Sequence, residues 1–148
     1  MDNLTCYIEQ ASPDAVIPTK ANADDRGYDI TLIGIEKKIG PVTFYTTGLR
    51  VELPTGWSWD LVPRSSISKK CHMLVNSFGV LDPGYRGIIL AALWKLDPEA
   101  PDLELPDKTL QLLLRAPTPD VDFVIRTLDL KTARGVTGFG DSDKIKGC

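Results

Sequence analysis

The chain has 148 residues, 43% of them hydrophobic and 25% charged, a balance that predicts one globular domain and excludes a disordered protein. Its net charge of −3 excludes the basic footprint of a protein that wraps long nucleic acid, so no nucleic-acid polymer is an expected partner. No apolar run approaches the ~20 residues of a membrane span and the first residues lack a secretion signal, which predicts an intracellular protein, cytoplasmic or nuclear, without a membrane partner.

A series of short strands is predicted in the N-terminal half by side-chain periodicity. Residues Tyr28–Ile33 alternate between polar and apolar, and Val42–Leu53 is rich in Thr, Val, Tyr and Phe, with a break at Gly48. Trp57 and Trp59 occupy alternate positions and therefore face the same side of a strand. We interpret these two tryptophans as packing residues rather than as a binding platform.

Longer apolar runs continue the pattern in the C-terminal half. The nearly continuous run Gly87–Leu96 is typical of a strand buried on both faces. Asp107–Arg115 is short, bounded by prolines and without a polar face of helical period, so we predict a strand there, and Val121–Ile125 adds a further short apolar segment. Many short strands separated by turn residues predict an all-β fold, a jelly-roll-like barrel or sandwich.

The last stretch of the chain differs in composition. Lys131–Cys148 contains glycines at positions 135, 138, 140 and 147, mixed charges and a single aromatic residue, Phe139. Such a segment buries little apolar surface by itself. We therefore predict a β domain over residues 1–130 and a mobile glycine-rich tail over residues 131–148.

The most specific signal lies between Asn76 and Gly87. Pro83-Gly84 fits the central positions of a type II turn, so we expect the residues on either side to pair as a hairpin. The backbone of a hairpin can mimic the edge of a complementary base, and Asn76 adds an amide that can pair with uracil. An ordinary surface hairpin has the same spacing, so spacing alone leaves both interpretations open.

The run from Gly79 to Gly87 resembles the third sequence motif of the trimeric dUTPase family. The resemblance implies that Asp82 is the catalytic carboxylate, which orients and deprotonates the attacking water, and that Tyr85 stacks under the deoxyribose. It also implies that the groups reading the uracil are Asn76 and the backbone of Gly79, Val80 and Leu81.

Two further motifs of the family precede this one in the chain. Ala23–Ile30 is similar to the first motif and implies that Asp29 holds Mg²⁺ through water. Pro63–Ser66 is similar to the second motif, although serine replaces its usual glycine at position 66. The phosphate-binding residues implied by this second motif are Arg64, Ser65 and Ser66.

The fourth and fifth motifs follow in the expected order. Leu110–Leu112 resembles the fourth, which implies that Gln111 reaches a phosphate, and Arg134–Gly140 resembles the fifth. The substrate-binding residues implied in this last motif are Arg134, Phe139, Gly140 and Ser142. Asp141 and Asp143 stand where relatives usually have small hydroxyl residues or glycine, and we expect these carboxylates to weaken closure of the tail and raise the Michaelis constant.

Together the five motifs imply an enzyme that hydrolyses dUTP to dUMP and pyrophosphate with Mg²⁺ as cofactor. This reaction keeps uracil out of DNA and supplies dUMP for dTMP synthesis. The resemblance also implies a homotrimer in which the tail of one subunit closes over the active site of a neighbour. A cellular and a viral origin are both compatible with the sequence.

Two alternative functions remain open on the sequence alone. The dCTP deaminases share the fold and parts of the second and third motifs, but their chemistry needs a glutamate shortly after the third motif. Ala92 stands at the matching position here, which argues against deamination. The other alternative is a catalytically weakened dUTPase-like module that binds a nucleotide or a protein; the retained Asp82 and Arg134 argue against it.

Overall fold

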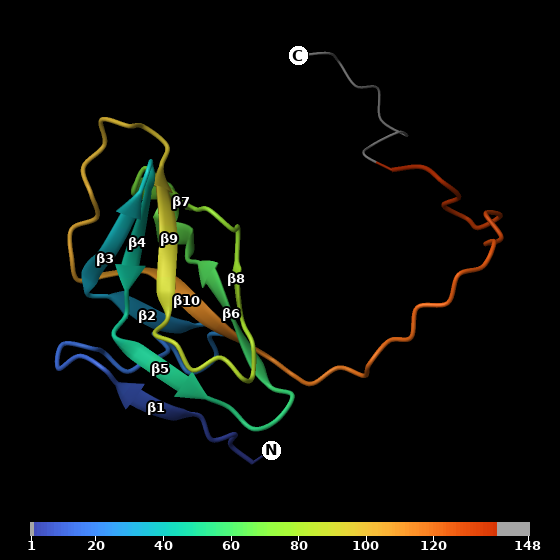
Figure 1. Ribbon diagram of the computed structural model, residues 1–148, viewed down its shortest axis with the longest axis horizontal. Coiled ribbons are helices and arrows are strands. Elements are labelled where there is room, and N and C mark those ends of the chain that lie inside the picture. The colour runs from blue at the N-terminus through green and yellow to red at the C-terminus, as the bar shows by residue number, and fades with distance from the viewer. Residues whose placement is uncertain (1, 139–148) are drawn as a thin grey trace. The chain divides into compact units, whose positions relative to one another are not determined.

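The computed structural model describes residues 2–138 and divides the chain into two units, Met1–Thr118 and Pro119–Cys148. The first unit contains every helix and strand found in the described residues (Figure 1). They are β1 (Tyr7–Gln10), β2 (Tyr28–Leu32), β3 (Gly34–Ile39), β4 (Val42–Thr46), β5 (Leu49–Glu52), β6 (Ser58–Pro63), the 3₁₀ helix η1 (Ser65–Lys69), β7 (His72–Leu74), β8 (Gly79–Leu81), β9 (Leu90–Lys95) and β10 (Asp107–Arg115). Within the described residues, no helix is long and apolar enough to cross a membrane.

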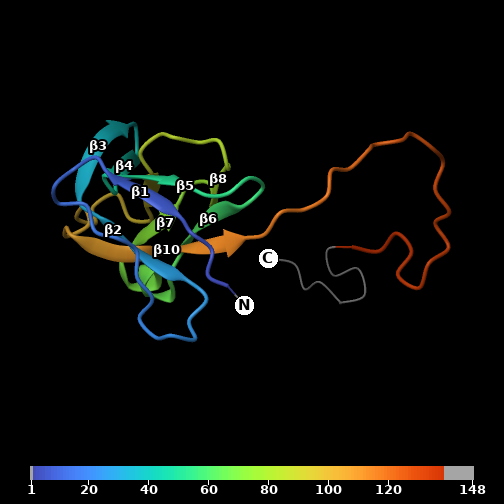
Figure 2. The same cartoon turned by 90° about the horizontal axis from the view of Figure 1, so that it is seen from below.

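The strands form three antiparallel sheets. Two four-stranded sheets have the orders β2-β10-β6-β8 and β3-β4-β9-β7, and β1 pairs with β5 in a third (Figure 2). Strand β10 is central to the first large sheet because it pairs with both β2 and β6. The predicted all-β fold is confirmed.

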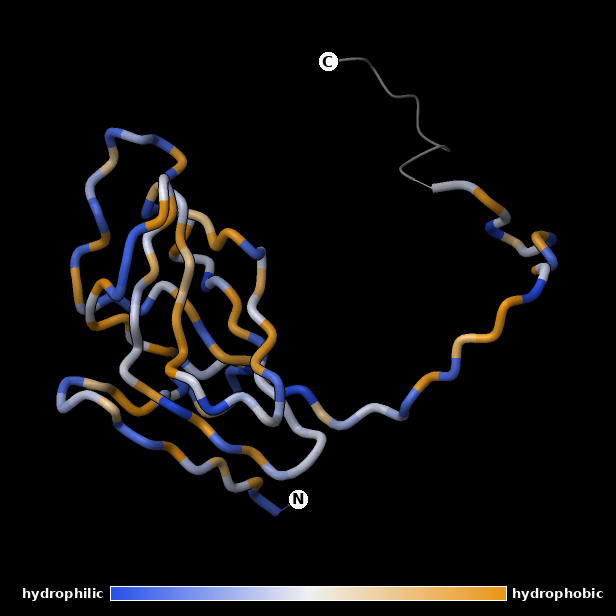
Figure 3. Tube along the Cα trace, viewed as in Figure 1, coloured by the Kyte–Doolittle hydropathy of each residue, from blue (hydrophilic) through white to orange (hydrophobic). Residues whose placement is uncertain are grey.

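The hydrophobic core lies between the inner faces of the two large sheets. Leu110 and Leu112 on β10, Tyr45 on β4 and Leu93 on β9 are each at most 1% exposed. These residues are flanked along their strands by more exposed ones. Figure 3 shows the hydropathy of the same strands. Burying each leucine stabilises the fold by roughly 1.5–3 kcal/mol.

Several predicted strands are found at the expected places. The break expected within Val42–Leu53 separates β4 from β5, where Gly48 has a φ of 66°, a left-handed conformation that favours glycine. Asp107–Arg115 is a strand over its whole length. Trp59 packs in the core and Trp57 against it, as predicted for packing residues.

Two expectations about apolar segments are wrong for the isolated chain. Strand β9 buries one face only: Ala91 and Leu93 point into the core, whereas Trp94 on the other face is 47% exposed. The segment Val121–Ile125 forms no strand, and Phe123 within it is 95% exposed. The apolar run at β9 predicted burial on both faces, but among the described residues the face that carries Trp94 stays partly exposed.

The loop between β9 and β10 is anchored by one carboxylate. Asp102 accepts from the Nζ atoms of Lys38 and Lys95, each at 2.9 Å, and the neighbouring Leu103 N–H donates to the Tyr45 hydroxyl at 3.1 Å. The hydrogen bond from Lys38, and then that from Lys95, lowers the pKa of Asp102 below its usual 3.8. These contacts hold the long connection against the β3-β4-β9-β7 sheet.

We expect the Asp102→Asn variant to have a lower melting temperature than the wild type at pH 7. Because the folded-state pKa of Asp102 is depressed, its contribution is present above the unfolded value of 3.8 and is lost as the pH falls through the folded value. The difference between the two proteins therefore shrinks below about pH 4. Thermal unfolding followed by circular dichroism between pH 3 and pH 7 measures this, and a difference independent of pH would contradict it.

Candidate functional site

The third motif does not form the predicted hairpin. Asp82–Tyr85 is a turn, with the Tyr85 N–H donating to the Asp82 carbonyl at 3.0 Å, but Gly84 lacks the positive φ that a type II turn requires. Strand β8, which precedes the turn, pairs with β6 instead of β9, so that Leu81 lies opposite Trp59. The correction follows from register, since β9 already pairs with β4 and β7 on its two edges.

The residues of this motif nevertheless converge on one cavity of about 320 Å³. Six predicted site residues line it, namely Asn76, Gly79, Val80, Leu81, Asp82 and Tyr85. Its remaining lining consists of Lys37, Phe44, Leu61, Leu90 and Ala92. We call this cavity the β8 pocket. Apolar walls with a few polar groups are typical of a site for a flat heterocyclic ligand.

Asp82 is an exposed carboxylate at the rim of the β8 pocket. Within residues 2–138 its side chain has no hydrogen-bond donor and no ion-pair partner. Both of its oxygens can therefore accept from a water molecule, as a general base requires.

Tyr85 is held in place by its own loop. Its hydroxyl donates to the Ile88 carbonyl at 3.0 Å, and its ring lies against Gly87 so closely that a Cβ at that glycine would overlap the phenol. The ring therefore has a fixed orientation before any ligand binds, which suits a residue proposed to stack on a sugar.

We expect Gly87→Ala to reduce dUTP hydrolysis by about tenfold, mainly through a higher KM, because the added methyl group displaces the Tyr85 ring. Gly84→Ala is a matched control in the same loop, since nothing lies within 4 Å of its added Cβ. Steady-state kinetics on both variants, with their melting temperatures, measure the effect. Equal kinetics for the two variants would show that Tyr85 is not positioned by Gly87.

The first, second and fourth motifs meet in a different place. Arg64, directly after β6, forms an ion pair with Asp29 of β2 at 3.1 Å and donates to the Lys108 carbonyl at 2.7 Å. Gln111 of β10 lies opposite Asp29 in the sheet and donates to the Pro63 carbonyl at 3.2 Å. We call Asp29, Arg64 and Gln111 the phosphate cluster. Ser65 and Ser66 open η1 beside it.

Close packing in the phosphate cluster involves Gly27 of the first motif. A Cβ at this glycine would overlap the Gln111 carboxamide. The Asp29 carboxylate is only 14% exposed and the Arg64 side chain 32%. The cluster is thus preformed, with the guanidinium held by a carboxylate and a carbonyl while part of it remains accessible to an anion.

Asp82 and the phosphate cluster lie near opposite ends of β6. Antiparallel pairing places Leu81 beside Trp59, so Asp82 lies near Ser58, whereas Arg64 follows the other end of the strand. The strand from Ser58 to Arg64 extends roughly 20 Å at ~3.3 Å per residue. Within one chain, the distance between the predicted base and the predicted phosphate ligands is therefore longer than a single phosphate group can span.

The fifth motif lies in the second unit. Arg134 takes part in a local turn: its Nε donates to the Thr137 carbonyl at 3.1 Å, and the Thr137 hydroxyl donates back to the Arg134 carbonyl at 2.9 Å. Gly135 within this turn has a φ of 62°. The predicted residues Phe139, Gly140 and Ser142 lie outside the described residues.

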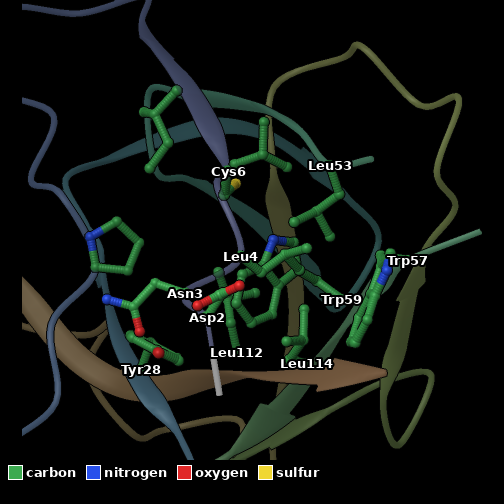
Figure 4. Close-up of a pocket in the computed structure, with 13 residues that line it drawn as sticks. Asp2, Asn3, Leu4, Cys6, Tyr28, Leu53, Trp57, Trp59, Leu112 and Leu114 are labelled. Atoms are coloured by element: carbon green, nitrogen blue, oxygen red, sulfur yellow. The ribbon is translucent and has the colours of Figure 1, made fainter. Parts of the chain in front are cut away.

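A larger cavity of about 720 Å³ contains none of the predicted site residues (Figure 4). Its walls are mostly apolar and come from β1, β5, β6 and β10, with Tyr28 and Trp59 meeting edge to face at a ring-centroid distance of 5.6 Å. Within the described residues no lysine or arginine lines it, so it offers a phosphate no cationic partner there. The smaller β8 pocket is therefore the better candidate for a nucleotide.

Sequence reasoning missed Lys37 and Phe44, which also line the β8 pocket. Their strands lie more than 30 positions before the third motif, so motif spacing carries no trace of the contact. The only available signal was register: Lys37 pairs with Phe44, and Phe44 pairs with Ala92 of the apolar run that follows the motif.

The described residues contain no group of three or more His, Cys, Asp or Glu side chains that could hold a metal ion. The phosphate cluster offers one carboxylate, Asp29, already paired with Arg64. Mg²⁺ commonly binds through one or two carboxylates, several waters and substrate phosphates. The donor set thus fits an ion delivered with a nucleotide and not a cage made by the protein alone.

Comparison with known proteins gives a consistent result. The dUTPase family model matches residues 13–143 of the chain. A deoxyuridine 5'-triphosphate nucleotidohydrolase of Rhodococcus erythropolis is 32% identical over 144 residues, which cover 95% of this chain and 87% of the relative. A protein of the same name from Nocardia farcinica is 35% identical over 139 residues, covering 91% of this chain and 83% of the relative.

Solved structures show the same fold. A dUTPase of Staphylococcus bacteriophage 80alpha, crystallised with dUpNHpp, superposes with a TM-score of 0.70 at 22% identity and covers 93% of this chain and 98% of its own. A dUTPase from phage phi11 of S. aureus, described with a structural Mg(II) ion, has a TM-score of 0.66 at 21% identity and covers 84% of this chain and 99% of its own. The jelly-roll-like architecture predicted from the sequence is confirmed.

Proposed function

The chain belongs to the dUTPase family, and from this membership we infer that it hydrolyses dUTP to dUMP and pyrophosphate. The observation in the structure that best supports this reaction is the β8 pocket, which joins apolar walls, the Asn76 amide and the Asp82 carboxylate, which has no partner among the described residues. The reaction keeps uracil out of DNA and supplies dUMP for dTMP synthesis. We propose that it takes place inside the cell, where nucleotide pools are used for DNA synthesis.

We propose that Asp82 is the general base of the reaction. Its free oxygens accept from a water molecule and remove a proton as that water attacks the α-phosphorus, and pyrophosphate leaves from the opposite side. A positioned base typically contributes about 10²–10⁴-fold to the rate. The exposed position of Asp82 at the pocket rim supports this role, because the triphosphate must extend out of the pocket that takes the base.

The proposed substrate contacts fall into two groups, one for the nucleoside in the β8 pocket and one for the phosphates. The uracil would lie against Asn76 and the backbone of Gly79, Val80 and Leu81, with the deoxyribose on Tyr85. The phosphates would be held by Arg64, Ser65, Ser66 and Gln111, and by Arg134, Gly140 and Ser142 of the fifth motif, while Phe139 of that motif would cover the uracil. Arginine is well suited to this task because its planar fork matches phosphate oxygens.

We propose a homotrimer whose active sites combine residues from different copies. The roughly 20 Å along β6 between the Asp82 end and Arg64 supports this, because within one chain the predicted base and the predicted phosphate ligand lie far apart. The exposed apolar face of β9 with Trp94, and the exposed Phe123 and Ile125 of the second unit, offer surface for a neighbouring copy to cover. Light scattering is expected to give three times the chain mass of 16.3 kDa.

Mg²⁺ is the proposed cofactor, with Asp29 as the carboxylate that holds it through water. When bound on the phosphates, the ion would neutralise charge on the leaving pyrophosphate. Asp29 also has a role within the protein itself, because its ion pair with Arg64 holds the guanidinium in place within the phosphate cluster.

Release of pyrophosphate from dUTP tests the proposed function directly. We expect hydrolysis of dUTP to exceed that of dTTP, dCTP and UTP, and to be lost when EDTA removes divalent ions. Ammonia release from dCTP, the product of the deaminase alternative, is not expected because Ala92 provides no acid beside the pocket. Absence of pyrophosphate release from dUTP with Mg²⁺ present would reject the proposal.

A further inference from the structure

Among residues 2–138, Lys37 is the only cationic side chain that lines the β8 pocket, and no motif of the family includes it. Its Nζ lies 4.9 Å from the centroid of the Phe44 ring, so the ammonium is held over an aromatic face by a cation–π contact. The remaining charged group of the pocket is Asp82, at the rim.

The register of the sheet places Lys37 and Asn76 on two sides of the part of the β8 pocket that Phe44 and Ala92 line. Lys37 pairs with Phe44, Phe44 pairs with Ala92, and the Ala92 carbonyl accepts from the N–H of Val75, the residue before Asn76. Neighbouring strands are ~4.8 Å apart, so Phe44 and Val75 are separated by roughly 10 Å across Ala92. A pyrimidine ring with a hydrogen-bonding group at each side fills such a span.

We propose that Lys37 is a specificity-determining residue that donates a hydrogen bond to O4 of the uracil. This inference rests on the proposed function, because it assumes that the β8 pocket takes the base. The carbonyl oxygen at position 4 has two lone pairs. The backbone of β8 and Asn76 approach the base from the side of its N3–H, and Lys37 reaches the lone pair on the side of C5.

A donor at this position discriminates between the three pyrimidines. An ammonium carries donors and no acceptor, so it matches O4 of uracil and opposes the exocyclic amino group of cytosine. Thymine keeps O4, but its C5 methyl group occupies the path to the lone pair that Lys37 uses. Lys37 thereby adds to selection against both competing bases.

The test compares the full-length wild type with Lys37→Met, which keeps the length of the side chain but removes the donor. Lys20→Met is the matched control, because Lys20 also lies over an aromatic ring, 5.0 Å from the centroid of Tyr28, but outside the β8 pocket. Calorimetry measures the affinities for dUMP, dTMP and pyrophosphate, and steady-state kinetics measure hydrolysis of dUTP and dTTP. Lys37→Arg, which retains a donor, should recover part of any loss.

We expect Lys37→Met to weaken dUMP binding and raise the KM for dUTP by about fivefold to tenfold, with kcat changed less than twofold. Selectivity for dUTP over dTTP should fall by a similar factor, while pyrophosphate affinity and the Lys20→Met control stay unchanged. An unchanged dUMP affinity in the folded variant overturns the proposal. So does equal weakening of dUMP, dTMP and pyrophosphate, which would indicate attraction of phosphate alone.

Different results would reject the role of Lys37 and the proposed function. A wild type that hydrolyses dUTP, together with a Lys37→Met variant of unchanged selectivity, rejects the role of Lys37 only. A wild type that binds dUMP through Lys37 but releases no pyrophosphate from dUTP rejects the proposed function and keeps the contact.

Discussion

Replacement of Asp82 by asparagine is expected to lower kcat for dUTP by about 10³-fold, within the range that a positioned general base contributes. Asparagine has the same shape but cannot take a proton from water. The turn that carries residue 82 is fixed by its backbone, through the Tyr85 N–H and the Asp82 carbonyl, and this bond is unaffected by the change. The fold and the affinity for dUMP should therefore be retained.

Asp14→Asn is a suitable control for Asp82→Asn, because Asp14 is an exposed acid of the same unit that lies outside the β8 pocket. Single-turnover measurement of pyrophosphate release, with dUMP binding by calorimetry, separates the chemical step from binding. If the Asp82→Asn protein kept more than about a tenth of wild-type kcat, the carboxylate would be acting on binding or structure and not as the base.

The fold was predictable from the sequence because its signals are local. Alternation in β4 and β5, the prolines that bound β10 and the glycine with positive φ at position 48 each act through neighbouring residues. Two of the failed predictions, unlike that of the hairpin after β8, concern which apolar surfaces are covered. Whether the second face of β9 or the segment around Phe123 is buried depends on what packs over it, and among the described residues Trp94 and Phe123 remain exposed.

The site was predictable only in part, for a similar reason. Family motifs identify which residues to examine, and the structure brings Asn76 and Tyr85 together around one pocket. Motifs do not state which residues belong to the same copy, and they gave no indication of Lys37 or Phe44. Those two contacts arise from cross-strand register, which is fixed by the packing of the whole sheet.

The proposed division of the site between copies can be tested by a complementation experiment. Asp82→Asn removes the base from the β8 pocket, and Arg64→Gln removes the cation from the phosphate cluster while leaving an amide to donate to Asp29. Each variant alone is expected to lose at least about 10²-fold in activity. If one site takes its base and its phosphate ligands from different copies, a mixed trimer contains a site with both groups intact.

Random assembly of the two variants in equal amounts should restore about a quarter of wild-type activity in a cyclic trimer. Three in four trimers then contain both variants, and one of their three sites has an intact Asp82 and an intact Arg64. The experiment requires unfolding the two proteins together and refolding them, so that copies exchange, and mixing without unfolding is the control. A site built within one chain predicts no recovery, because every chain carries one defect. Recovery after joint refolding, without recovery in the mixing control, would establish that a second copy supplies the groups missing from one end of β6. The residues at the two ends of β6 would then be complementary parts of one active site formed by two copies.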